Sequence, residues 1–284
     1  MSRPGFLKKP MPPAPPRPKG EVRSGSYALQ VQGAPWKFTL LHDRTEDMVL
    51  WVTRGQGRVI VSGILRGIST NNALFLPAGT LFSVEMQQGT QALFVQSPAG
   101  LSPYMPHAPL LLRVRDSLSQ AELTGTIDAM NREASQKRPM LQEALAAHVG
   151  LIAVWLHRQV QAGATDIPPE SAAQRLVRRY AQAVTRDFRL PKVMGQYAEA
   201  LDVTPTHLSR VCRGCCGKTA ADILTERKLH AARLALESPT PAVKEVARSL
   251  GFASPAYFTR FIQSHTGHTP SALRAATRRP PVRA

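Results

Sequence analysis

The sequence predicts an α+β protein, in which an N-terminal β-barrel, a helical connector and a C-terminal all-α domain with two helix-turn-helix units follow one another. Short stretches rich in β-branched and aromatic residues, separated by glycine and proline, fill the first part of the chain. From Ser119 onward apolar residues recur every three or four positions, and the last third of the chain repeats itself. A chain of 284 residues is long enough for two domains. The expected segments are a proline-rich tail (1–23), a sheet domain (24–115), a helical connector (116–169) and a helical domain (170–284).

The charge of the chain points to a polyanionic partner. The 36 Lys and Arg residues and 19 Asp and Glu residues give a formal net charge of +17. Residues 170–284 carry most of the excess, whereas residues 24–169 are nearly neutral. Such a field favours nucleic acid or an anionic membrane surface as the partner. Because the sequence has neither an apolar run of about 18 residues nor an apolar leader, we expect a cytoplasmic protein without a membrane span.

The first segment, residues 1–23, is expected to be a disordered basic tail. Seven prolines between Pro4 and Pro18 remove backbone donors and favour polyproline II over helix or strand. The expected role is that of a solvated leader, with weak electrostatic help in binding DNA as the alternative.

Six stretches of residues 24–115 have the composition of strands. Many short strands at this spacing predict a β-sandwich or a small barrel. The stretches are Trp36–Leu41, Met48–Thr53, Arg58–Val61, Ala73–Leu76, Leu81–Met86 and Ala92–Gln96.

A long helix is expected from about Pro139 to Val160, followed by a linker over Gly163–Pro169. One apolar stripe of this helix faces either a second copy of the chain or the barrel. We favour the dimer, because paired protomers suit paired half-sites on DNA. The stripe consists of Leu141, Leu145, His148, Ile152 and Trp155.

The C-terminal third contains an internal duplication. Thr204-Pro205 matches Ser254-Pro255 at an offset of 50 positions, and Arg210 matches Arg260. Upstream the offset is 49, so Ala253 is an extra residue in the second copy. Two copies of one small unit are therefore expected.

Each copy has the parts of a helix-turn-helix. A short amphipathic helix, near Val193–Leu201 or Ala242–Leu250, precedes a tight turn. Thr204 or Ser254 can then cap a second helix whose first residue is proline. The helical stretch Ala221–Glu237 would join the two copies as a rigid connector.

The second helix of each copy presents a polar and partly cationic face opposite its apolar residues. Such a helix fits the major groove of DNA, where arginine can bond guanine bidentately, while the capped amides lie near phosphates. If the copies are held about 34 Å apart, both helices enter successive major grooves. The alternative is a pair of core helices with solvated faces, but the duplication and the charge favour DNA. The residues predicted to contact DNA are Thr204, Thr206, Ser209, Arg210 and Arg213 in the first copy and Ser254, Ala256, Thr259, Arg260 and Gln263 in the second.

Three stretches, Ala198 to Arg210, Val246 to Phe261 and Gly267 to Arg274, resemble the DNA-binding domain of the AraC/XylS family of bacterial transcription regulators. The similarity covers residues 170–276. It implies two helix-turn-helix units joined by a long helix, and sequence-specific binding to promoter DNA, most often for activation beside RNA polymerase.

One departure from that family is a cluster of thiols. Where the family usually has an aromatic residue this chain has Cys212, followed by Cys215 and Cys216. A tetrahedral zinc site needs four ligands, and His207 lies on the far side of a helix turn. Because free cysteine is more often a small buried hydrophobe, we expect no metal and no cofactor, with a redox role as the lesser alternative.

The N-terminal domain resembles, more weakly, the cupin-type β-barrel with which many of these regulators bind effectors. The resemblance lies in Leu50 to Gly57 and Leu74 to Thr80. Cupin enzymes place a metal-binding histidine three residues after the glycine of a Pro-x-Gly turn, and Phe82 stands there in this chain. Metal chemistry is therefore not expected. Six aromatic residues form either an apolar effector pocket or a packed barrel core: Trp36, Phe38, Trp51, Phe75, Phe82 and Phe94.

Together these features predict a sequence-specific transcription regulator, not an enzyme. The expected partners are double-stranded promoter DNA, RNA polymerase, a small-molecule effector and a second copy of the chain, and not a membrane. Two alternatives stay open: a cupin enzyme, metal-dependent or metal-free, with a DNA-targeting domain, and an architectural protein that binds every duplex alike.

Overall fold

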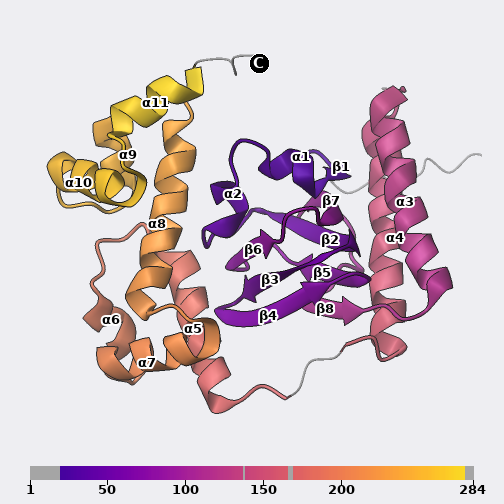
Figure 1. The fold of residues 1–284 in the computed structure, drawn as a ribbon, viewed down its shortest axis with the longest axis horizontal. Coiled ribbons are helices and arrows are strands. Elements are labelled where there is room, and N and C mark those ends of the chain that lie inside the picture. The colour runs from indigo at the N-terminus through magenta and orange to yellow at the C-terminus, as the bar shows by residue number, and fades with distance from the viewer. Residues whose placement is uncertain (1–19, 137, 166–168, 279–284) are drawn as a thin grey trace, which may run out of the picture.

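The computed structural model describes residues 20–136, 138–165 and 169–278, so most of the predicted tail lies outside the described residues. A sheet domain occupies the middle of the molecule, with two long helices on one side and the C-terminal helices on the other (Figure 1). No helix of the described part is long and apolar enough to cross a membrane. The strands are β1 (Arg23–Ser26), β2 (Glu46–Arg54), β3 (Gln56–Val61), β4 (Ile64–Ser69), β5 (Asn72–Leu76), β6 (Phe82–Met86), β7 (Gln91–Pro98) and β8 (Leu110–Arg113). The helices are α1 (Tyr27–Val31), α2 (Trp36–Thr39), α3 (Ser117–Gln136), α4 (Leu141–Gln161), α5 (Ala172–Asp187), α6 (Met194–Glu199), α7 (Pro205–Cys216), α8 (Ala220–Leu236), α9 (Val243–Ser249), α10 (Pro255–Thr266) and α11 (Pro270–Arg278).

The strands form two antiparallel sheets rather than one closed barrel. The larger sheet has the order β1-β7-β2-β5-β8, and the smaller one β4-β3-β6. Strand β2 shows how they are stacked, because Asp47 to Val52 are all buried. Leu50 points into the core between the sheets, while Trp51 points to the core on the opposite face of the large sheet. The alternation follows from the two-residue period of a strand.

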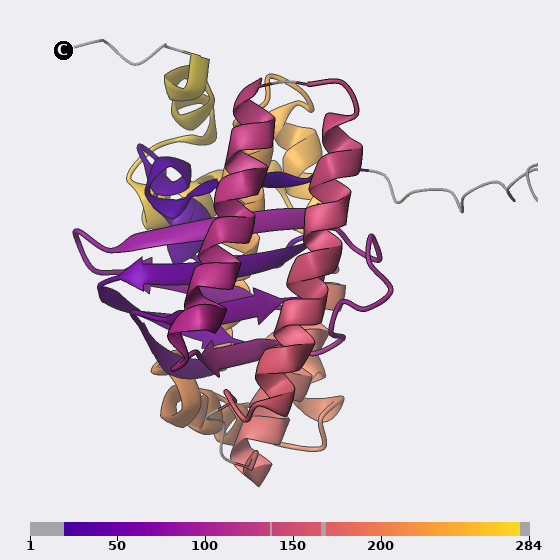
Figure 2. The same ribbon diagram turned by 90° about the vertical axis from the view of Figure 1, so that its right-hand side faces the viewer.

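Helices α3 and α4 cover the outer face of the large sheet (Figure 2). This overturns the preferred assignment of the apolar stripe to a dimer contact. Leu145, Ile152 and Trp155 are buried against the sheet, and the Trp155 indole donates to the carbonyl of Ser119. The outer face of the large sheet is apolar and would be exposed to water without a covering layer. The stripe of α4 packs there because the two apolar surfaces bury each other.

One predicted strand, Trp36–Leu41, is wrong, because the chain forms the helical turn α2 there. Pro35 has helical angles, and its carbonyl accepts hydrogen bonds from Phe38 and Thr39. A fixed proline φ starts a helical turn, and this local preference outweighs the strand-like composition. The other five predicted strands are present, and three short ones (β1, β4, β8) were not predicted.

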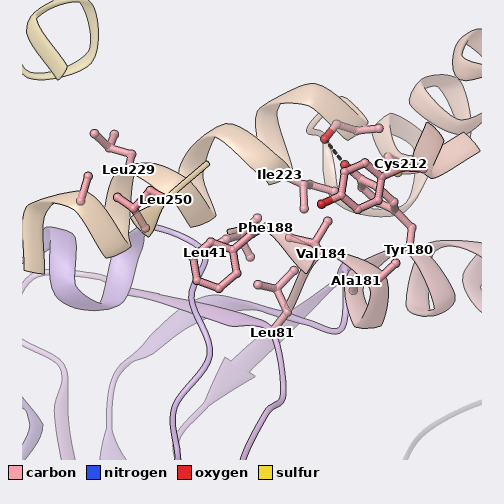
Figure 3. Close-up of a cluster of buried hydrophobic side chains, with 14 of the residues drawn as sticks. Leu41, Leu81, Tyr180, Ala181, Val184, Phe188, Cys212, Ile223, Leu229 and Leu250 are labelled. Atoms are coloured by element: carbon pink, nitrogen blue, oxygen red, sulfur yellow. Dashed lines mark hydrogen bonds between the residues drawn. The ribbon is translucent and has the colours of Figure 1, made fainter. Parts of the chain in front are cut away.

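The C-terminal helices share one hydrophobic core, which extends into the sheet domain. In Figure 3, Leu41 and Leu81 of the sheet domain lie beside Val184 and Phe188 of the helical domain. The Tyr180 hydroxyl donates to a backbone carbonyl at the start of α8. The two domains are thus packed against each other through apolar side chains.

Polar contacts around this core also join the domains. The ammonium group of Lys37 lies 2.8 Å from the carboxylate of Glu237, and Arg227 pairs with Asp43. The imidazole rings of His42 and His230 stack at 4.2 Å with an interplanar angle of 9°. These contacts place the middle of α8 directly on the segment that follows α2.

Candidate nucleic-acid interface

The duplicated units predicted from the sequence form two helix-turn-helix pairs, α6–α7 and α9–α10. Both second helices are 12 residues long and begin with proline. The hydroxyl of Thr204 accepts from the His207 amide, and that of Ser254 from the Tyr257 amide. These caps satisfy helix-end amides that have no partner inside the helix. The predicted caps are therefore confirmed.

The tight turn of each unit depends on one residue in the left-handed region. Asp202 has φ +58° in the first unit, and Gly251 has φ +70° in the second. A Cβ at Gly251 would stand 2.4 Å from the carbonyl oxygen of Arg189. Glycine is needed there both for the backbone angle and for the close approach, whereas aspartate tolerates the angle alone.

The inner faces of α7 and α10 pack in the shared core. Leu208 and Cys212 in the first unit, and Phe258 and Ile262 in the second, are fully buried. Phe252, in the turn of the second unit, contacts the ring of Phe258 edge-on and the ring of Phe261 at a tilt. This packing fixes which side of each second helix faces outward.

The outward faces hold the residues predicted to contact DNA. In α7, Thr206, Arg210 and Arg213 are exposed and Ser209 is half-buried. The α10 helix repeats this with Ala256, Arg260 and Gln263 exposed and Thr259 half-buried. The polar ridges are therefore free on the surface and not packed inside, as a groove-binding helix requires.

Two side-chain contacts orient polar groups on these ridges. The Arg210 guanidinium lies 3.0 Å from the Nδ1 atom of His207, which holds the arginine over the first turn of α7. The Thr259 hydroxyl donates to the carbonyl of Pro255. It retains acceptor capacity for a base or a phosphate.

Helix α8 connects the units, with α7 near its start and α10 near its end (Figure 1). Its 17 residues give a length of about 25 Å at 1.5 Å per residue. Thr219 and Asp222 cap its first turn reciprocally. Because α8 is also anchored on the sheet domain, the two units are attached to one continuous support.

The three cysteines lie on the inner side of α7. Cys212 and Cys216 are buried and Cys215 is partly buried. Burial raises the pKa of Cys212 to about 12 and also raises the pKa of the other two thiols. Thiols held protonated in this way are poor nucleophiles and poor metal ligands. No group of three or more His, Cys, Asp or Glu side chains in the described residues could hold a metal ion.

The six aromatic residues do not form the predicted effector pocket. Phe38, Phe82 and Phe94 fill the core between the sheets. Trp51 and Phe75 belong to the other core, under α3 and α4. Alternate residues of a strand point to opposite faces of a sheet. Trp51 and Phe75 therefore lie on one face of the large sheet, and Phe94 lies on the other.

Trp36, the sixth of these aromatics, contacts the helical domain. Its ring lies 5.4 Å from that of His230, and the Arg233 guanidinium stacks over it at 4.2 Å. The tryptophan therefore joins the domains and lines no cavity described here.

A cavity of about 560 Å³ lies elsewhere, where the open edges of the two sheets meet α5. None of the six aromatics lines it. Its residues come from the Pro77–Thr80 turn, the 107–111 segment, the β3–β4 hairpin and α5. Leu74 and the Pro77–Thr80 turn, which also line the cavity, belong to the stretch that resembles a cupin.

Comparison with known proteins assigns the C-terminal region. Residues 197–276 match the family described as a helix-turn-helix domain, which spans both units. No curated protein matches the chain. The region is an AraC-type helix-turn-helix domain, and proteins with this domain are DNA-binding regulators that are generally not enzymes.

Three solved structures illustrate the likeness. An apo form of ToxT from Vibrio cholerae is 12% identical, with a TM-score of 0.44 over 92% of this chain and 99% of that one. The C-terminal domain of AraT, a response regulator from Geobacillus stearothermophilus, is 24% identical, with a TM-score of 0.36 over 40% and 95%. A transcriptional regulator with an AraC-type DNA-binding domain from Chromobacterium violaceum is 20% identical, with a TM-score of 0.34 over 38% and 96%.

Proposed function

We propose that this chain reads promoter DNA through both helix-turn-helix units at once. Its C-terminal domain is that of an AraC-type DNA-binding transcription regulator. The observation that carries this proposal is the pair of capped helices, α7 and α10, each exposing a polar and cationic ridge at one end of α8. Each ridge enters a major groove, and the two grooves follow one another along the same duplex.

In this proposal the ridge residues divide into three roles. Arg210 and Arg260 read base edges, because a guanidinium can bond guanine bidentately. Ser209 and Thr259 add shorter polar contacts. The other residues on these faces adjust how closely each helix approaches the DNA. They are Thr206 and Arg213 in α7 and Ala256 and Gln263 in α10. The capped helix ends at Thr204 and Ser254 position the units on phosphates, which carry no sequence information.

The decisive experiment is selection of binding sites by the full chain from a random duplex library. A specific reader enriches a two-part site, whereas equal recovery of all sequences would establish the architectural alternative. We expect Arg260→Ala to relax the preference at one base position by about 1–3 kcal/mol. Arg54→Ala is the matched control, because Arg54 is exposed at the end of β2 in the sheet domain, outside both units and α4. It removes the same charge and should leave the selected site unchanged.

The remaining parts of the proposal concern the sheet domain and α4. We assign the sheet domain to sensing and α4 to pairing of two protomers, with RNA polymerase as the partner of the DNA-bound form. Leu151 and Val154 support pairing, because they are apolar and exposed on the outer side of α4. Sedimentation equilibrium of the wild type and of Leu151→Glu tests this, and a wild-type monomer at micromolar concentration would refute it. The proposed place of action is the cytoplasm.

A further inference from the structure

The cavity between the sheet domain and α5 is a feature that DNA reading does not use. Its volume of about 560 Å³ falls within the roughly 300–1,000 Å³ of small-molecule sites. Figure 3 shows two of its lining residues, Leu81 from the sheet domain and Ala181 from the helical domain, close together. A ligand here would touch both domains.

The walls of the cavity are partly apolar. Ile64, Leu110 and Leu111 line it and are only half-buried. Covering water-exposed apolar side chains with a ligand lowers the free energy of the complex, because it removes apolar surface from water. The cavity therefore favours a ligand with a hydrocarbon or aromatic body.

Two guanidinium groups give the cavity its charge. Arg66 reaches it from β4, and none of the ion pairs described here involves Arg66. Arg178 reaches it from α5 and is held by Glu170 through two parallel hydrogen bonds of 2.9 and 3.0 Å. A guanidinium binds a planar carboxylate through two parallel hydrogen bonds. The Glu170 carboxylate therefore shows that the site at Arg178 can bind a carboxylate group.

The Glu170–Arg178 pair is open to exchange. The side chains are 30% and 42% exposed, and an ion pair at such exposure contributes little to stability. The hydrogen bonds from Arg178 hold the pKa of the Glu170 carboxyl below its usual value, so the glutamate stays ionised and competes with any incoming carboxylate.

We propose that this cavity binds a small amphipathic carboxylate, whose apolar body lies against Leu110 and Leu111 and whose carboxylate takes the place of Glu170 at Arg178, with Arg66 as the second cation. This inference rests on the proposed sensor role of the sheet domain and names the ligand class and the exchange. The exchange changes the start of α5, because Glu170 directly precedes Ser171, the residue that caps α5.

Helix α5 can pass this change to the DNA-binding units. The β3–β4 hairpin presses on α5 where Gly63 faces Val177, leaving no room for a Cβ. Farther along α5, Tyr180 and Val184 belong to the core shared with α7 and α8. A ligand that joins Arg66 to Arg178 therefore ties the sheet domain to α5 more firmly.

Titration calorimetry of the full chain with benzoate and with octanoate tests the proposal, and octanamide serves as the neutral probe. We expect at least one carboxylate to bind and octanamide to bind more weakly. Arg66→Gln should weaken binding about tenfold, as expected for a lost hydrogen bond to a charged group. Glu170→Gln should strengthen it severalfold, because the internal competitor is gone. Arg58→Gln is the matched control, because Arg58 pairs with Glu85 on the exposed side of β3.

Two outcomes would overturn the site. One is that neither carboxylate binds the wild type at millimolar concentration. The other is binding that Arg66→Gln and Glu170→Gln leave unchanged while both variants stay folded by circular dichroism. Because no DNA is present, this test is independent of site selection. A chain that selects a DNA site but binds no carboxylate refutes only the ligand, and the reverse result refutes only the DNA reading.

Discussion

At the scale of single residues, the second helix-turn-helix depends on a glycine. Gly251 combines a left-handed backbone with direct contact to the carbonyl groups of Arg189 and Leu190. The first unit places Asp202 at the matching point, with a backbone of the same left-handed conformation. The duplicated units have thus diverged where the second one packs on the chain that follows α5.

Gly251→Ala is expected to lower the free energy of unfolding by more than about 1 kcal/mol, because the new Cβ meets a carbonyl oxygen and the residue must keep a positive φ. Urea unfolding followed by circular dichroism measures this. Gly214→Ala is the matched control, because nothing lies within 4 Å of a Cβ there and the residue is inside α7. That change should stabilise the protein by up to about 1 kcal/mol. Equal midpoints for Gly251→Ala and the wild type would contradict the close approach.

At the scale of elements, α7 and α10 are defined by how they begin and end. Each starts with a hydroxyl cap and a proline, and each ends at a glycine with a positive φ, Gly217 or Gly267. Such signals act within one helical turn, so they work alike in both copies. Their outer faces are then set by the apolar residues on the inner side.

Ser254→Ala removes the cap of α10 and should cost about 1 kcal/mol of stability, because the Tyr257 amide loses its acceptor. Thermal unfolding of the full chain reports the loss. Ser264→Ala is the control from the same helix, because its hydroxyl donates to the Phe261 carbonyl, which the helix also uses, and caps no end. If both alanine variants unfold at the same temperature, the cap contributes nothing.

At the scale of the whole molecule, two histidines sit where the domains meet. His42 and His230 are buried, and Arg44, Arg227 and Lys37 surround them. Burial, together with these charges, lowers the pKa of both imidazoles, that of His230 to about 3. Both rings are therefore neutral in the folded protein at neutral pH.

Acidification is expected to destabilise the protein through these rings. Between about pH 3 and the unfolded pKa near 6.5, the unfolded chain binds more protons than the folded one, so stability falls as pH falls through this window. By pH 5.5 the loss should reach about 1 kcal/mol per ring. Urea midpoints at pH 7.5 and 5.5 measure it. His230→Phe should reduce the pH dependence, whereas His268→Gln, at an exposed position, should not. An unchanged pH dependence in His230→Phe would contradict the assignment.

Much of the helical domain follows from sequence alone, because its signals are local. Thr204-Pro205 and Ser254-Pro255 mark helix starts in both copies, and the spacing of Leu208 and Cys212 predicts which side is buried. The Trp36–Leu41 stretch shows the limit of composition, because a single proline turned a strand-like segment into a helical turn.

The order of the elements and the two exposed ridges follow from local signals in the sequence, since caps, prolines and apolar periods act over a few residues. The folded chain was needed to show which face of the sheet each aromatic joins, that the α4 stripe packs on the sheet, and that Arg66 meets Arg178 in one cavity. Those contacts join segments about a hundred residues apart, and the docking of α3, α4 and α5 on the sheets creates them. No local pattern encodes that docking, because it depends on which apolar surfaces cover one another.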